Sequence, residues 1–195
     1  MGFLRLRDTY LINHFIKRKI TMSGSKSKIK GNSFERDIAQ FLTKLYGESF
    51  VRAAHSGAYI GGKNQIRKEV LSEGQIKSFK GDIIPPDGWQ YFNAELKSYK
   101  DFAFHSLFSG SQKVLDKWLE QCYEVANEND LSFLIMKFDR IGKYICVPAE
   151  LGWTTSNYFV YASKQHDRVY HICELTEFFE KHSDAFKKRC HSVGG

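Results

Sequence analysis

The stretch GDIIPPDGWQYFNAELK, residues 81–97, places Asp82 at the start of one short apolar segment and Glu95 and Lys97 within the next. The intervening Pro85-Pro86-Asp87-Gly88 is typical of a tight turn, because proline presets φ at a central position and glycine accepts a positive φ. We therefore expect Asp82 and Glu95 to lie on the two arms of one hairpin, which makes this stretch decisive for the fold.

The segment around Glu95 predicts a strand with one polar and one apolar face. Residues i and i+2 of a strand point to the same side, so Glu95 and Lys97 share a face with Asn93, whereas the apolar residues between them face the core. Together with Asp82, these groups place two carboxylates and an ammonium on one side of a sheet, which suits a hard divalent cation and a bound water. The alternative is that the charged side chains form an ordinary solvated surface.

Residues 34–46 predict an amphipathic helix that carries a third carboxylate. Apolar side chains recur there at helical spacing and form one stripe: Phe34, Ile38, Phe41, Leu42 and Leu45. We expect Asn32 or Ser33 at the N-cap and Gly47 just beyond the C-terminal end. Glu35 then lies in the first turn at the border of the buried face, where it serves a site or completes a capping box.

Four short motifs follow one another along the chain: KGNSFERDIA at 30–39, VRAAHSG at 51–57, GDI at 81–83 and ELKS at 95–98. In this order they resemble the PD-(D/E)XK nuclease superfamily, and within it most of all the archaeal-type Holliday junction resolvases and their phage relatives. Each motif alone is common, whereas the ordered series is specific. The segment 57–80 is longer than a compact resolvase needs, which indicates either an arm that touches the nucleic-acid backbone or an ordinary surface insertion.

The resemblance implies a divalent-metal-dependent DNA endonuclease that hydrolyses phosphodiester bonds. Its catalytic set would comprise Glu35, Asp82, Glu95 and Lys97. The metal ligands would be Asp82, Glu95 and the backbone carbonyl of Leu96, with Glu35 as a further candidate. Coordination by oxygen alone favours Mg²⁺, with Mn²⁺ as a substitute, over zinc. Lys97 would position the attacking water or neutralise charge that develops on the phosphate.

Basic and polar side chains near the motifs are expected to contact the DNA backbone: Arg52, Ser56, Lys63, Arg67, Lys68 and Lys80. Gln112 is a further candidate, because the second helix begins near the site. The resemblance implies branched DNA, a four-way junction, as substrate and a homodimer as the enzyme, because a two-fold junction suits a two-fold protein. The alternatives are a restriction-type or duplex endonuclease on the same core and a non-catalytic DNA-binding module. No nucleotide cofactor is expected, because the chain has no phosphate-binding glycine motif.

The pattern beyond residue 98 completes an α/β protein. A helix with one apolar face is expected over about 112–126, followed by strands near 133–136, 144–147, 157–162 and 168–173 and by a C-terminal helix. With the preceding elements this predicts a restriction-endonuclease-like core, a central mixed β-sheet flanked by helices in the order αβββαβ, with a C-terminal β/α extension. Aromatic residues between 99 and 110 are expected to cover an edge of the core rather than to stack on bases.

The net charge of +7 on 195 residues is unevenly distributed. Residues 1–31 hold eight basic residues against one acidic residue, which leaves 21 of each in the remainder. We therefore expect a basic, flexible leader at 1–29 ahead of a single nuclease domain at 30–195. No apolar run reaches the length of a membrane span, and four well-separated cysteines favour free thiols in a reducing cytoplasm.

Overall fold

The computed structural model describes residues 29–54, 80–109 and 112–191. The chain divides into two compact units, residues 1–33 and 34–195, and the second holds every strand of the described residues. The expected leader and the segment 57–80, interpreted as a nucleic-acid-contacting arm or a surface insertion, lie outside the described residues except for the last residue of each.

The centre of the second unit is a five-stranded mixed sheet with the order β3-β4-β5-β7-β6. Its strands are β3 (Phe92–Tyr99), β4 (Leu131–Phe138), β5 (Gly142–Pro148), β6 (Tyr158–Ser163) and β7 (Arg168–Glu174). β3 and β4 run parallel, whereas all other neighbours in this sheet are antiparallel. A parallel pair needs a long crossover, and the helix α3 (Lys113–Glu124) lies in the connection between β3 and β4. The predicted mixed sheet flanked by helices is confirmed.

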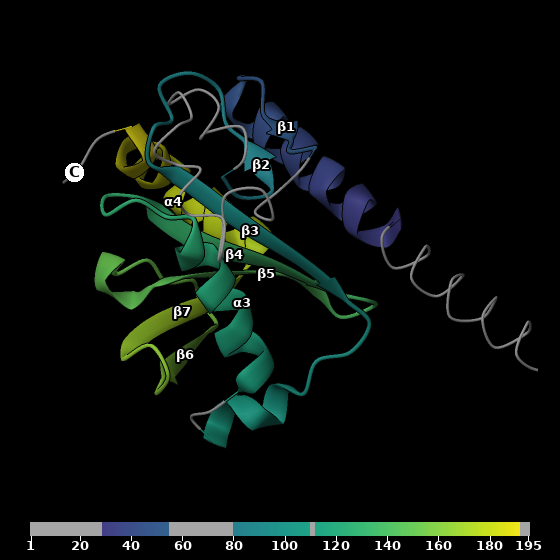
Figure 1. Ribbon diagram of the computed structural model, residues 1–195, viewed down its shortest axis with the longest axis vertical. Helices are drawn as coiled ribbons and strands as arrows, with labels where there is room; N and C mark the ends of the chain where they lie inside the picture. The colour runs from purple at the N-terminus through teal and green to yellow at the C-terminus, as the bar shows by residue number, and fades with distance from the viewer. Residues whose placement is uncertain (1–28, 55–79, 110–111, 192–195) are drawn as a thin grey trace, which may run out of the picture. The chain divides into compact units, whose positions relative to one another are not determined.

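Helices cover both faces of this sheet (Figure 1). In the second unit these helices are α3, α4 (Leu175–His191) and residues 34–46 of the N-terminal helix. One apolar core packs Ile38 of the N-terminal helix and Phe178 of α4 against Phe133 of β4. A second core packs Trp118 of α3 against Leu134, the next residue of β4. Since neighbouring residues of a strand point to opposite faces, β4 is buried from both sides.

The N-terminal helix buries most of the predicted apolar stripe, although Leu45 is 39% exposed, and it begins earlier than expected. Phe34, Ile38 and Leu42 are almost completely buried, and the helix ends at Gly47, whose φ of 68° is the left-handed conformation that glycine tolerates. The expected N-cap at residue 32 or 33 is wrong, because the chain is already helical at residue 29. A helix fixed by core contacts from residue 34 onward extends easily into the preceding residues, since propagation costs far less than nucleation.

The expected hairpin is replaced by a different strand pairing. β2 (Ile83–Ile84) pairs with β1 (Val51–Arg52) in a separate two-stranded antiparallel sheet, not with β3. The predicted turn is present, since Trp89 donates its backbone N–H to Pro86 O at 3.3 Å and Gly88 has a φ of 90°. After the turn, however, Trp89 is fully buried, with its ring 4.9 Å from that of Phe50. This anchoring of Trp89 in the core separates the end of β2 from the start of β3.

The segment between β3 and α3 follows the sequence-based expectation in part. Phe102 stacks on Phe138 at a centroid distance of 4.8 Å, and Phe104 meets the same ring edge to face at 5.2 Å. Phe102 and Phe104 therefore cover an edge of the core, as predicted, whereas Phe108 is 82% exposed and does not. All four cysteines are buried free thiols. No helix within the described ranges is both long and apolar enough to cross a membrane.

Candidate active site

Strand β3 brings Glu95 and Lys97 together on the face predicted from the alternation. The Lys97 ammonium donates a hydrogen bond to Glu95 Oε1, and the two side chains are 20% and 13% exposed, respectively. Asn93, two residues earlier on the same face, is fully buried and donates to Cys122 O at 2.8 Å and to Ser132 Oγ at 2.9 Å. The polar face of β3 is thus buried at one end and accessible at Glu95 and Lys97.

Asp82 lies beside β3 although it does not belong to a hairpin with it. Its backbone N–H donates to Ala94 O at 2.8 Å, and its Oδ2 accepts the N–H of Leu96 at 2.7 Å. Since the N–H and C=O of one strand residue point to the same side, the Leu96 carbonyl also faces the side of β3 on which Asp82 lies. The prediction that Asp82 lies near Glu95 is therefore correct, but the hairpin from which it was predicted is not present.

Gly81 makes this close approach possible. Its φ is 67°, and a Cβ atom at this position would lie only 2.6 Å from Ala94 O. Glycine is the residue that both tolerates a positive φ and allows such contact between two backbones. The glycine that precedes Asp82 is therefore required by the geometry of the site.

Glu35 joins the site from the N-terminal helix. It accepts a hydrogen bond from Arg52 Nε at 2.5 Å, and the two side chains are 15% and 25% exposed. Arg52 lies on β1 opposite Ile83 of β2, so the β1–β2 pairing brings Arg52 beside the residue that follows Asp82. Glu35, Asp82, Glu95 and Lys97, which lie in three separate motifs, influence one another electrostatically in the folded chain.

The charges of this cluster are not balanced. Burial raises the pKa of Glu95 to about 7, the negative charge of Asp82 adds to this effect, and Lys97 opposes it. Burial also raises the pKa of Glu35, against the opposing hydrogen bond from Arg52. Burial alone would lower the pKa of Lys97, but the Glu95 carboxylate together with other nearby groups, Asp82 among them, outweighs burial, and the pKa ends above its ordinary value. Three carboxylates with two cations therefore leave a buried site that is short of positive charge.

A divalent cation would fit this deficit. Asp82 and Glu95 provide hard oxygen donors, and Mg²⁺ is usually held by one or two carboxylates while it keeps several waters. Within the described residues, however, no three His, Cys, Asp or Glu side chains gather into a ready-made metal cluster. The donor set thus suits an ion bound by two carboxylates, water and substrate rather than one enclosed by protein ligands.

Of the residues expected to contact DNA, most lie outside the described part of the chain, and Lys80 is buried. Ser56, Lys63, Arg67 and Lys68 lie outside the described residues. Lys80 is only 5% exposed and forms an ion pair with the buried Asp130, so the structure argues against a contact between Lys80 and a DNA backbone.

Arg52 and Gln112 each make a contact within the protein. Arg52 is partly exposed and engaged with Glu35. Gln112 Oε1 accepts the N–H groups of Val114 at 2.7 Å and Leu115 at 3.1 Å, which makes it the N-cap of α3. That Gln112 belongs to the site stays a prediction, although its side-chain oxygen already accepts two hydrogen bonds from α3.

Sequence reasoning missed two polar residues that support the site. Asn93 was placed on the correct face but not recognised as a buried link to α3 and β4. Asp130, the partner of Lys80, gave one signal, namely an acidic residue directly before the apolar strand β4. Its partner lies 50 positions earlier in the sequence, so this signal alone does not identify the pair.

The fold and the site define the class of this protein as a nuclease of the PD-(D/E)XK type. A mixed sheet between helices carries a Glu-x-Lys triplet on β3, an Asp lies beside that strand, and a third carboxylate comes from the first helix. The model of the family described as "Phage putative PDDEXK endonuclease" matches residues 26–189, and the chain belongs to this family. No curated protein and no solved structure gives a match. Membership implies endonuclease activity on DNA, and nucleases of this superfamily generally use divalent metals.

Proposed function

We propose that this chain is a Mg²⁺-dependent endodeoxyribonuclease that resolves four-way DNA junctions, with Mn²⁺ as a possible substitute ion. The observation that carries the proposal is the placement of Asp82 against β3, where its carboxylate lies beside the strand that presents Glu95 and Lys97. The catalytic residues are Glu35, Asp82, Glu95 and Lys97.

Each residue has a role that follows from its surroundings. Asp82 and Glu95, with the Leu96 carbonyl, would hold the divalent ion, which supplies polarisation of the scissile phosphate and a lowered pKa of a bound water. Lys97 keeps its proton because the Glu95 carboxylate raises its pKa, so its ammonium can stabilise negative charge on the phosphate. Arg52 fixes Glu35 in an orientation from which its carboxylate can hold water next to the site.

The preference for a junction rests on the ordered motifs, which resemble those of resolvases. A four-way junction has two equivalent strands to cut, so a homodimer with paired sites is the simplest enzyme for it. A restriction-type or duplex endonuclease would use the same residues, and a non-catalytic DNA-binding module would use none of them for cleavage. Substrate choice and metal dependence separate these alternatives.

The test is a cleavage panel with the purified full chain. Four-way junctions, linear duplex and single strands of matched sequence are incubated with Mg²⁺ at one stated salt concentration, because DNA affinity depends steeply on salt. We expect paired nicks in the junction, no cleavage in EDTA, and loss of cleavage in Glu95→Gln with DNA binding retained. Glu180→Gln, which changes an exposed carboxylate on α4, is the matched control.

Each alternative predicts its own outcome. Faster cleavage of linear duplex than of the junction would show that the protein is a duplex endonuclease and not a junction resolvase. DNA binding without any Mg²⁺-dependent nicking would indicate the non-catalytic module. Undiminished cleavage by Glu95→Gln would refute the assignment of the site itself. The oligomeric state is measured by analytical ultracentrifugation with and without junction DNA, and a monomer on the junction would exclude the two-fold enzyme.

A further inference from the structure

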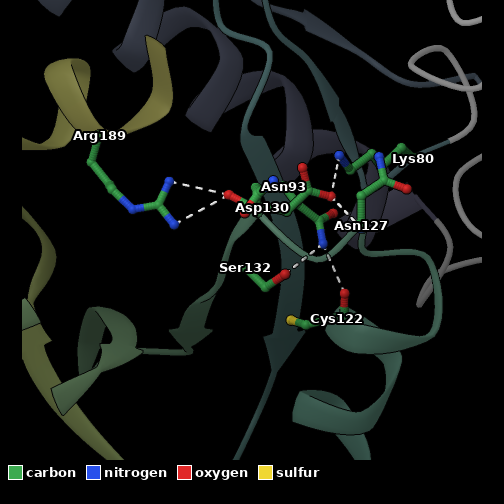
Figure 2. A network of polar contacts seen from close by, with 8 residues as sticks. Lys80, Asn93, Cys122, Asn127, Asp130, Ser132 and Arg189 are labelled. Atoms are coloured by element: carbon green, nitrogen blue, oxygen red, sulfur yellow. Dashed lines mark hydrogen bonds and ion pairs between the residues drawn. The ribbon is translucent and has the colours of Figure 1, made fainter. Parts of the chain in front are cut away.

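A buried ion pair lies two residues before Asp82 in the sequence. Lys80 is 5% exposed, and its ammonium contacts the carboxylate of Asp130, whose side chain is 1% exposed (Figure 2). A buried ammonium is costly unless it is paired and hydrogen-bonded, and removal of either partner leaves an uncompensated charge. The pair is therefore a fixed connection between the segment that leads to Asp82 and the residue before β4.

Asp130 is itself held rigidly at the start of β4. Its Oδ2 accepts the backbone N–H of Asn127 at 2.5 Å, and Leu131 donates its N–H to Tyr91 O at 2.7 Å. From α4, both terminal guanidinium nitrogens of Arg189 donate to Asn129 O at 3.2 Å (Figure 2). The carboxylate that receives Lys80 thus lies between two anchored residues: Asn129 is bound by α4, and Leu131 is bound to Tyr91, the residue before β3.

The residues between Lys80 and the site transmit this anchoring. Gly81 packs directly on the backbone of Ala94, and Asp82 then makes its two hydrogen bonds to β3. The chain from Lys80 to Asp82 is therefore attached to the sheet at three successive residues, through an ion pair, a backbone contact and a carboxylate. Of these three contacts, only the ion pair reaches Asp130, the residue before β4.

We propose that Lys80 is a positioning residue, which through Asp130 fixes the segment that carries Asp82 and so sets the affinity of the site for its divalent ion. The inference rests on the proposed function, in that Asp82 is taken as a ligand of the ion. It replaces the expectation that Lys80 binds a DNA phosphate, because the ammonium is buried and engaged with Asp130. Residues that orient metal ligands typically alter metal affinity or activity by about 10- to 100-fold when they are changed.

The experiment measures binding of Mg²⁺ alone to the full chain by isothermal titration calorimetry. We expect Lys80→Met to weaken Mg²⁺ binding by about 10-fold or more, while the affinity for junction DNA in EDTA stays at the wild-type value. Lys80→Arg, which keeps a cation at this position, should recover most of the Mg²⁺ affinity. Lys187→Met is the matched control, because it removes the more exposed pair between Lys187 and Glu48 and should leave Mg²⁺ binding unchanged.

A second variant protects the test against loss of folding. Lys80→Met/Asp130→Asn carries neither buried charge and keeps a side-chain oxygen for the Asn127 amide, and we expect it to bind Mg²⁺ as weakly as Lys80→Met. Wild-type Mg²⁺ affinity in both variants, even with a lower melting temperature, would reduce the pair to a structural role and overturn the proposal. Weaker DNA binding in EDTA with a smaller salt dependence would instead make Lys80 a phosphate contact.

The failure of this inference is distinguishable from failure of the proposed function. If wild type binds Mg²⁺ and cleaves DNA but Lys80→Met matches it in Mg²⁺ affinity, only the positioning role is lost. If wild type neither binds Mg²⁺ nor cleaves, the proposed function is refuted, and the positioning role falls with it.

Discussion

Replacement of Glu95 by glutamine should change the pH dependence of stability in a predictable direction. In the metal-free fold the pKa of Glu95 is about 7, against an ordinary value of 4.5, because the carboxylate is buried and lies near Asp82. The folded state therefore binds this proton more tightly than the unfolded state does. Stability from the group is fully present below about pH 4.5 and is lost as the pH rises through about 7.

The size of the effect follows from the two pKa values. Each pKa unit corresponds to about 1.4 kcal/mol, so wild type should lose about 2 to 3 kcal/mol from this group between roughly pH 5 and pH 8. Glu95→Gln does not titrate and should lack this loss. The variant also leaves Lys97 without its carboxylate partner, so the two proteins are compared by how their stability changes with pH. For each protein, the difference between the free energies of unfolding at the two pH values is therefore the diagnostic quantity.

The assay is urea and thermal unfolding of both proteins in EDTA at the two pH values. For a chain of this size, 1 kcal/mol shifts the melting temperature by roughly 2 to 4 °C. From the lower to the higher pH, the melting temperature of wild type should therefore fall by about 5 to 10 °C more than that of the variant. Excess Mg²⁺ should reduce the difference, because a bound cation favours the ionised carboxylate. Equal pH dependence of wild type and Glu95→Gln in EDTA would show that Glu95 is not desolvated in the fold and would refute this reasoning.

Three further changes test the surroundings of the site. Gly81→Ala should destabilise the fold by about 2 kcal/mol or more and reduce cleavage, because the new Cβ meets Ala94 O at 2.6 Å and φ is positive; urea unfolding and cleavage rates measure both effects. Arg52→Met should raise the pKa of Glu35 further, so that in EDTA the variant loses more stability than wild type as the pH rises above the ordinary carboxyl range; equal losses would contradict the pairing. Gln112→Ala should cost about 1 kcal/mol through loss of the α3 cap, with Mg²⁺ binding by calorimetry unchanged; weaker Mg²⁺ binding would return Gln112 to the site.

The local pattern of β3 was sufficient to predict its part of the site. Strict alternation places Ala94 and Leu96 in one core and Glu95 and Lys97 on the opposite face, and the structure has this arrangement. The order of helices and strands was also predictable, because it follows from periodicity within each element.

The pairing of strands and of charges was not predictable in the same way. The turn after β2 has the sequence of a hairpin, but burial of Trp89 and the pairing of β2 with β1 depend on residues more than 30 positions away. Lys80 reads as a surface cation in a basic segment, and only its proximity to Asp130 in the fold explains why it is buried. In both cases the pairing depends on contacts between residues far apart in the sequence, which the local pattern does not contain.

The hydrogen bond between the Leu96 amide and Asp82 has a consequence for solubility. β3 forms one edge of the five-stranded sheet in the described residues, and an open edge presents N–H and C=O groups that can recruit a strand of another chain. Asp82 occupies the Leu96 N–H and the Ala94 carbonyl, and its charge further opposes strand addition. Asp82→Ala would expose that amide and favour aggregation, whereas Asp82→Asn keeps an acceptor for it. The asparagine variant is therefore the better inactive protein for trapping complexes with DNA.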